Sequence, residues 1–245
     1  DRLGRKLTMI LAAIMFSASA IGCAFCADFN QLVLYRIIGG VGIGVVSIVS
    51  PLYISEVSVA QYRGRLVSLY QLAITVGFLG AYLMNYQLLS WSNSSAVVTD
   101  GWINRIFVSE VWRGMLGMET LPALFFFLII FFIPESPRWL IVWGNDSRAT
   151  NILKRIYGSL KEATLQLNEI KSLLQTSSMA QSEWRLLLQP GIRKAVAIGA
   201  SIAILGQFMG VNAVLYYGPS IFENAGLSSG DSLFYQVMIG LVNTL

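Results

Sequence analysis

Two charged residues lie within long apolar stretches of this sequence, where an unpaired charge would cost several kcal/mol if the stretch crossed a membrane. Arg36 is the only charge between residues 29 and 55, and Glu119 is the only charge between residues 114 and 133. The arrangement with the lowest cost places the two side chains together as an ion pair. We expect this pair either to lock two helices together or to respond to a proton or to a conformational change.

Three carboxamide side chains are further polar groups in apolar stretches: Gln71, Gln207 and Asn212. An amide combines a donor and an acceptor on one planar group, and a sugar hydroxyl is also both donor and acceptor. These amides therefore suit a neutral polyol better than an ion. The alternative is that each amide only joins its own helix to a neighbouring one.

A pair of tyrosines, Tyr216 and Tyr217, directly precedes Gly218 and Pro219. Proline lacks a backbone N–H and glycine is a poor helix former, so Gly218 and Pro219 together predict a helix break near the outer face of the membrane. The two tyrosines would then lie next to the break.

Other kinds of chemistry are excluded. The sequence has no histidine, so imidazole catalysis and histidine-bound metals are ruled out. Cys23 and Cys26 form a single C-x-x-C in an apolar stretch, which without a second pair predicts neither a metal nor a redox centre. Gly40, Gly42 and Gly44 do not match the G-x-G-x-x-G of phosphate-binding loops. Gly40 and Gly44 share one helix face, where small residues let a neighbouring helix approach closely. We expect that the protein binds no cofactor and no metal and that it is not an enzyme.

The composition is that of a membrane protein. Of 245 residues, 55% are hydrophobic and 12% are charged, and the mean hydropathy is +0.63. Soluble domains carry about 25% charged residues, and disordered chains need still more charge and less hydrophobicity. Six apolar stretches suit membrane helices, the last of them cut off by the chain end: 7–27, 37–55, 66–89, 114–133, 195–222 and 232–245. The predicted fold class is an all-α membrane protein.

The basic residues predict the orientation. All but three of the 17 Lys and Arg residues fall in loops on one side of the membrane. Arg105 and Arg113 fall on the other side, and Arg36 lies within a span. Because cytoplasmic loops are enriched in Lys and Arg, the basic side is expected to be cytoplasmic. The pI of about 9.1 thus reflects topology and requires no nucleic acid.

The one long polar segment, 134–193, lies on the cytoplasmic side. Apolar residues recur in it at helical spacing, among them Ile152, Leu153 and Ile156, and predict short amphipathic helices against the membrane part. The chain therefore divides into a membrane part at 1–133, a cytoplasmic helical linker at 134–193 and a second membrane part at 194–245.

Several motifs together resemble the sugar porter family of the major facilitator superfamily, and most closely its bacterial D-xylose:proton symporters. The matching segments are DRLGRK at 1–6, Arg36 with Gly40, Gly42 and Gly44, PLYISE at 51–56, Arg63-Gly64, PESPRWL at 134–140, and QFMGVN at 207–212 followed by Tyr216-Tyr217. Each motif is moderately specific, and six in the right order are strongly specific.

The resemblance implies a partial major facilitator fold. It aligns residues 1–133 with helices three to six of an N-terminal bundle, and residues 194–245 with helices seven and eight of a C-terminal bundle. The full fold would have twelve helices in two bundles around a site at the membrane midplane.

The resemblance also implies the functional residues. It assigns substrate contacts to Gln71, Gln207 and Asn212, and an outer gate over the sugar to Tyr216 and Tyr217. It assigns proton coupling to Arg36 and Glu119. It assigns an inner-gate charge network to Asp1, Arg2, Arg5, Glu56, Arg63, Glu135 and Arg138.

Two positions depart from the family pattern. Gly206 stands where the family has the first of two adjacent glutamines, and Phe78 stands where the xylose symporters have a glutamine. A glycine at 206 would weaken xylose binding or leave room for a hexose, unless it only lets a neighbouring helix pack closely.

We therefore expect a secondary transporter of the inner or plasma membrane that moves a neutral monosaccharide, xylose or a related pentose or hexose, with protons. Its partners would be the sugar, protons and the lipid bilayer. The alternatives are a transporter-like sugar sensor and an inactive truncated fragment.

Overall fold

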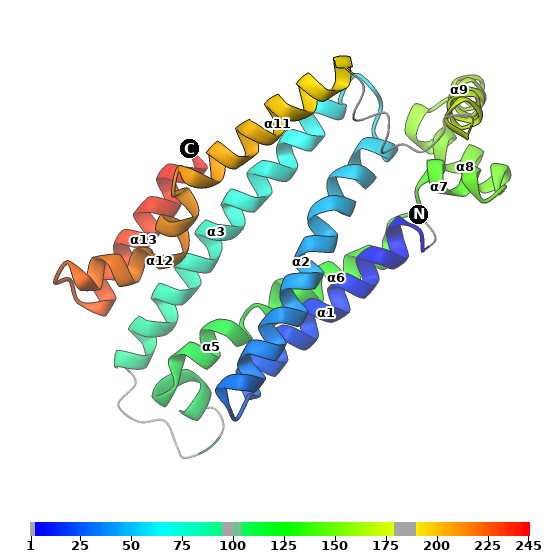
Figure 1. Ribbon diagram of the computed structural model, residues 1–245. Coiled ribbons are helices and arrows are strands. Elements are labelled where there is room, and N and C mark those ends of the chain that lie inside the picture. The colour runs from blue at the N-terminus through cyan, green and yellow to red at the C-terminus, as the bar shows by residue number, and fades with distance from the viewer. Residues whose placement is uncertain (1–2, 95–100, 102–103, 179–189) are drawn as a thin grey trace.

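The computed structural model describes residues 3–94, 101, 104–178 and 190–245, and Figure 1 shows them as an assembly of helices. No strand occurs among these residues. The helices of the first part are α1 (Arg5–Phe25), α2 (Phe29–Val57), α3 (Arg63–Ser94), the π-helical η1 (Arg105–Ser109), α5 (Val111–Gly117) and α6 (Thr120–Phe132). Those that follow are α7 (Pro137–Val142), α8 (Asp146–Tyr157), α9 (Leu160–Ser178), α11 (Pro190–Phe208), α12 (Val211–Asn224) and α13 (Ser229–Thr244).

Five helical segments of the described chain are long and apolar enough to cross a membrane. They are α1, α2, α3, α5 with α6, and α11 with α12. The helix α13, where the sequence predicts a sixth, truncated span, has 16 residues. Many apolar side chains on these helices point outward, such as Phe132, which is 88% exposed. Outward apolar side chains are expected where the surroundings are lipid.

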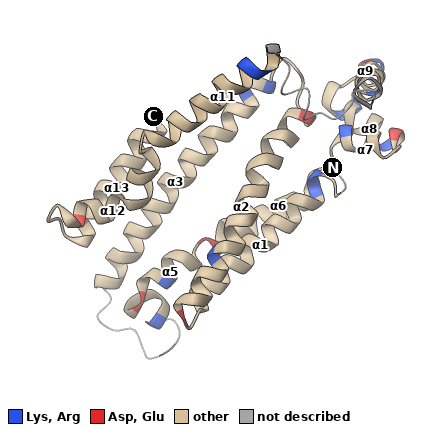
Figure 2. Cartoon of the chain, in the orientation of Figure 1, with Lys and Arg blue, Asp and Glu red and all other residues tan. Residues whose placement is uncertain are grey.

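The long helices form two groups (Figure 1). In one group α1 packs against α2, α5 and α6, and in the other α3 packs against α13, which in turn packs on α12. The chain order therefore does not match the grouping, because α3 comes from the first half of the chain and pairs with a helix from its end. Figure 2 shows Lys, Arg, Asp and Glu gathered toward the two ends of the long helices and on α7, α8 and α9. We call the end that carries α7, α8 and α9 the inner end.

The contact between α1 and α2 depends on glycines that differ from the predicted ones. A Cβ on Gly39 would collide with Ser19 Oγ, and one on Gly42 would lie 3.0 Å from the ring of Phe16. By contrast, no described atom lies within 4 Å of a Cβ built on Gly40 or Gly44. Among the described residues, α1 therefore packs on the face of Gly39 and Gly42, and the expectation that a helix packs on the face of Gly40 and Gly44 stays a prediction.

Two helix breaks also differ from the sequence prediction. The break expected at Gly218-Pro219 is absent, and Pro219 lies inside α12. The chain instead breaks at Gly210, whose φ of 75° is a left-handed conformation that favours glycine. The predicted span at 114–133 is divided into α5 and α6, and Glu119 is the N-cap residue of α6.

Arg113 closes the outer end of α1, although the sequence marks it only as an outer-loop charge. The residue is 6% exposed, and its Nη1 donates hydrogen bonds to the carbonyls of Cys26 and Ala24 at the end of α1. Its Nε donates to Glu110. The Arg113 guanidinium, aided by that of Arg105, holds the pKa of the half-buried Glu110 below its ordinary value.

The amphipathic helices predicted for the polar segment are present. Ala149 and Ile152 of α8 pack with Leu140 of α7 and with Leu167 and Ile170 of α9. Asn145 caps α8 by accepting a hydrogen bond from the Arg148 N–H. These helices position the short PESP segment that leads into α7.

We expect Gly22→Ala to destabilise the packing of α1 on α2. A Cβ at this position would collide with three ring atoms of Tyr35, which belong to the middle of a large side chain and cannot move cheaply. Overpacking of this kind costs about 1–3 kcal/mol. The melting temperature of the purified whole protein in detergent should fall by several degrees.

The matched control is Gly64→Ala. A Cβ at Gly64 meets no described atom within 4 Å, and Ala favours helix over Gly by about 1 kcal/mol. This variant should melt at or above the temperature of the parent. Equal melting temperatures of the parent, the Gly22→Ala and the Gly64→Ala proteins would contradict the described α1–α2 contact.

Candidate functional site

Four residues form a compact polar cluster at the inner end, which we call the inner cluster: Arg5, Glu56, Glu135 and Ser136. Arg5 Nε and Nη2 donate to the two Glu56 oxygens over 3.2 and 3.1 Å, and the side chains are only 13% and 5% exposed. The Ser136 hydroxyl donates to Glu56 Oε2 over 2.5 Å. The cluster thus joins α1, the end of α2 and the start of α7.

Glu135 binds the start of α1 through backbone groups. Its Oε1 accepts hydrogen bonds from the N–H groups of Arg5 (2.9 Å), Lys6 (3.1 Å) and Ser136 (2.9 Å). First-turn N–H groups have no partner within their own helix, and the helix dipole favours a negative charge there. Gly4 makes the approach feasible, since its φ is 77° and a Cβ on it would lie 2.6 Å from Glu135 Oε2.

Of the other inner-gate residues, the structure describes Arg63 and Arg138, and neither bonds to this cluster in the described chain. Arg63 and Arg138 are exposed, and within the described chain neither forms an ion pair. Asp1 and Arg2 lie outside the described residues. The structure therefore brings together three of the five inner-gate residues that it describes and adds Ser136, which the sequence analysis missed.

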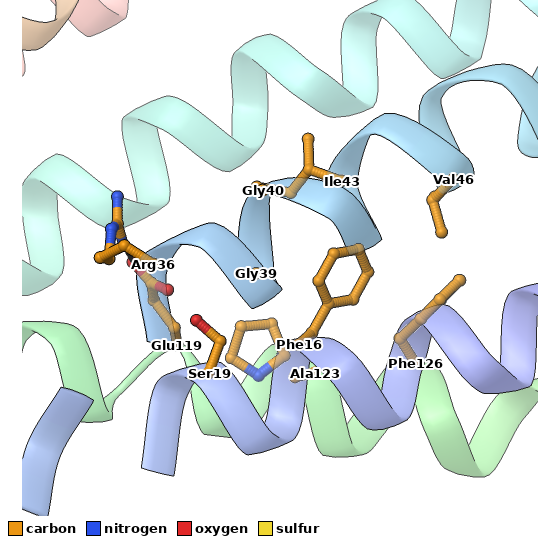
Figure 3. A pocket seen from close by; sticks show the side chains of 11 residues that line it. Phe16, Ser19, Arg36, Gly39, Gly40, Ile43, Val46, Glu119, Ala123 and Phe126 are labelled. Atoms are coloured by element: carbon orange, nitrogen blue, oxygen red, sulfur yellow. Dashed lines mark hydrogen bonds and ion pairs between the residues drawn. The ribbon is translucent and has the colours of Figure 1, made fainter. Parts of the chain in front are cut away.

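Arg36 and Glu119 form the predicted ion pair. Arg36 Nη1 lies 3.3 Å from Glu119 Oε1, and both side chains are 54% exposed. Figure 3 shows them at one end of a pocket between α1, α2 and α6. The pocket has a volume of about 400 Å³, and its other walls are largely apolar and include Phe16 and Phe126. The pair is therefore open to water or to a further polar group, unlike the inner cluster.

Gln207 and Asn212 meet at the break between α11 and α12. Asn212 Nδ2 donates to Gln207 Oε1 over 2.9 Å, with Gly210 between the two residues in the chain. No other described residue hydrogen-bonds these amides. The Gln207 nitrogen and the Asn212 oxygen are thus a free donor and a free acceptor side by side. The side-chain amide of Gln71, on α3, forms no hydrogen bond with a described residue.

The predicted gate tyrosines lie one turn beyond the amides. Tyr216 and Tyr217 are each 66% exposed on α12. The Tyr216 ring meets the edge of Phe78 on α3, with ring centroids 6.2 Å apart. Phe78, one of the two positions that depart from the family pattern, is therefore in contact with a gate tyrosine. A Cβ on Gly206, the other departure, would meet no described atom within 4 Å.

Sequence reasoning missed several polar residues that hold the site in place. Tyr53 donates its hydroxyl to the carbonyl of Pro134 over 2.9 Å, which ties α2 to the PESP segment. Tyr82 and Gln236 both bind the carbonyl of Leu215, next to Tyr216. Tyrosine and glutamine in an apolar stretch are the only signal that the sequence offers for these contacts.

The fold is part of the major facilitator superfamily fold. A solved structure of the xylose transporter XylE from E. coli, in a partially occluded inward-open conformation, matches with a TM-score of 0.79 and 32% identity, covering 100% of this chain and 54% of that one. The family described as sugar (and other) transporter matches residues 1–245, and the chain belongs to this family.

Two curated relatives illustrate the family. The D-xylose-proton symporter of Escherichia coli K12 is 35% identical over an alignment of 261 residues that covers 99% of this chain and 50% of the relative. The galactose-proton symporter of the same strain is 35% identical over an alignment of 246 residues that covers 100% of this chain and 48% of the relative. The chain spans about half the length of the curated relatives it matches.

We expect Glu135→Ala to lower the melting temperature of the whole protein by several degrees. The change frees the first-turn N–H groups of Arg5 and Lys6, and losing a helix cap costs about 0.5–2 kcal/mol. Glu135→Gln keeps an acceptor oxygen and should recover part of the loss. Arg138→Ala, at an exposed neighbour without an ion pair in the described chain, should leave the melting temperature unchanged; an equal loss there would argue against a capping role for Glu135.

Proposed function

We propose that the whole protein is a secondary transporter that carries a neutral monosaccharide through the membrane by alternating access, together with protons. The observation that carries the proposal is the amide pair Gln207–Asn212 at a helix break, which offers an adjacent donor and acceptor without a charge. Broken helices at membrane depth supply substrate sites in transporters of this kind. The names of the two curated relatives, a xylose and a galactose symporter with protons, support the same class of substrate.

The substrate range would extend from pentoses to hexoses. Vicinal sugar hydroxyls fit a neighbouring donor and acceptor, and Gln71 is a third amide available for a hydroxyl. The open space around Gly206 would accept an extra hydroxymethyl group. Phe78, which contacts Tyr216, would provide an apolar wall where a glutamine would otherwise contact the sugar.

Proton coupling would act through Arg36 and Glu119. A single hydrogen bond joins them, and both are half exposed, so a proton can reach the carboxylate and compete with Arg36. Glu119 also occupies the joint between α5 and α6. Neutralising it would release Arg36 and loosen the link between α2 and that joint.

The inner cluster would stabilise the state that is closed on the inside. Its carboxylates and Arg5 are largely buried and have several partners, so separating α1, α2 and α7 would leave charges unpaired. Exposed Arg63 and Arg138, with Asp1 and Arg2, would extend this network at its surface.

We expect the whole protein in proteoliposomes to accumulate labelled xylose or galactose when an inward proton gradient is applied. Asn212→Ala should raise the half-saturating sugar concentration about two- to tenfold, the range for one lost hydrogen bond. Asn151→Ala on the surface of α8 is the matched amide control and should change nothing. Sugar binding without accumulation would indicate a sensor, and neither binding nor accumulation would indicate an inactive protein.

We expect Glu119→Gln to reduce proton-driven accumulation much more than sugar exchange between the two sides. Glutamine keeps the shape and an acceptor for Arg36 but cannot release a proton. Accumulation and counterflow are measured on the same vesicles. An equal loss of both would leave the pair with a structural role only.

A further inference from the structure

Pro219 leaves one backbone carbonyl of α12 without its usual partner. In an α-helix the carbonyl of residue 215 accepts from the N–H of residue 219, and proline has no N–H. Leu215 is buried, with an exposed fraction of 8%. A buried carbonyl without a partner is destabilising, so another donor is needed at this place.

Two side chains from two other helices supply the donors. The Tyr82 hydroxyl on α3 donates to the Leu215 oxygen over 2.9 Å, and Gln236 Nε2 on α13 donates to the same oxygen over 2.9 Å. A carbonyl oxygen has two lone pairs and can accept both. These two bonds explain why α12 continues through Pro219 instead of ending there.

Glycines give both donors access to the carbonyl. A Cβ on Gly240 would lie 2.7 Å from the Tyr82 ring, so this glycine lets α13 approach α3 closely. A Cβ on Gly218 would overlap Gln236 Oε1, so only glycine leaves room for that amide. Gln236 Oε1 has no hydrogen-bond partner among the described residues, and the amide is held by its nitrogen alone.

We propose that Tyr82 and Gln236 are positioning residues that fix the gate tyrosines by binding the carbonyl that Pro219 frees. We call this arrangement the Leu215 clamp. The inference rests on the proposed transport function, and it adds residues and a mechanism to the gate. Tyr216 is the next residue after Leu215, and its ring already meets Phe78 one turn from Tyr82.

The clamp joins the two halves of the chain. Tyr82 comes from the first half of the chain, whereas Leu215 and Gln236 come from the second. Tyr82 lies nearer the outer end of α3 than its inner end. The bond from Tyr82 therefore holds the outer parts of α3 and α12 together, and breaking it favours the state that is open to the outside.

The test measures this equilibrium directly in the whole protein. Spin labels replace Ser90 on α3 and Glu223 on α12, with Cys23 and Cys26 changed to serine, and pulsed electron resonance gives the distance distribution. Tyr82→Phe should increase the ratio of long to short distances about two- to tenfold, the range for one hydrogen bond. Tyr86→Phe is the matched control, because the Tyr86 hydroxyl forms no hydrogen bond with a described residue and the change keeps the contact of its ring with Phe234.

Pro219→Ala tests the cause. The alanine supplies the missing N–H, so the Leu215 carbonyl no longer needs the tyrosine, and Tyr82→Phe should have a much smaller effect in this background. Gln236→Met keeps the length of the side chain but removes its donor, and it serves as a second variant if Tyr82→Phe does not fold. It should shift the distances in the same direction.

Identical distances in Tyr82→Phe and Tyr86→Phe would overturn the clamp, and so would an undiminished effect of Tyr82→Phe in the Pro219→Ala protein. Sugar uptake by the labelled parent protein is measured in parallel. If the labelled parent transports sugar and the Tyr82→Phe change leaves the spin-label distances unaltered, only the clamp is refuted. A parent that does not transport refutes the proposed function, whatever the distances show.

Discussion

A backbone amide or carbonyl in an apolar span has no water to hydrogen-bond with, so it needs a partner within the protein. Several contacts between helices in this protein follow from that constraint. The first turn of α1 donates to Glu135, the last carbonyls near its other end accept from Arg113, and the carbonyl freed by Pro219 accepts from Tyr82 and Gln236. In each case the partner comes from another part of the chain. The same bonds that satisfy the backbone therefore also hold the helices together.

The two groups of charges follow opposite physical logic. The Arg5–Glu56 pair is nearly buried and has Ser136 as a further partner, so its charges are costly to separate and suit a closed contact. The Arg36–Glu119 pair is half exposed, has one hydrogen bond and borders a pocket, so its carboxylate stays accessible to a proton.

Sequence reasoning predicted what depends on composition and on large energies. The apolar spans, the amphipathic helices of the polar segment and the pairing of Arg36 with Glu119 all follow from the cost of placing polar groups in lipid. The meeting of Gln207 and Asn212 was not predicted, because it depends on a break at Gly210 that shortens the path between them.

Sequence reasoning could not establish which helix lies next to which. Glycine spacing alone could not decide between the face of Gly40 and that of Gly39, because the choice depends on where α1 lies. Pro219 predicted a break because local rules ignore donors from distant helices, and Tyr82 lies more than a hundred residues away in the chain. Such contacts are set by tertiary packing, which one sequence does not reveal.

The central claim is that side chains of other helices satisfy the free backbone groups at helix ends, and amide hydrogen exchange tests it most directly. In the whole protein in lipid nanodiscs, the N–H groups of Arg5 and Lys6 should exchange at least about tenfold more slowly than those of Phe29 and Asn30. The latter begin α2, whose N-cap residue Asp28 makes no side-chain bond to the helix start. Equal exchange at the two helix starts would contradict the account.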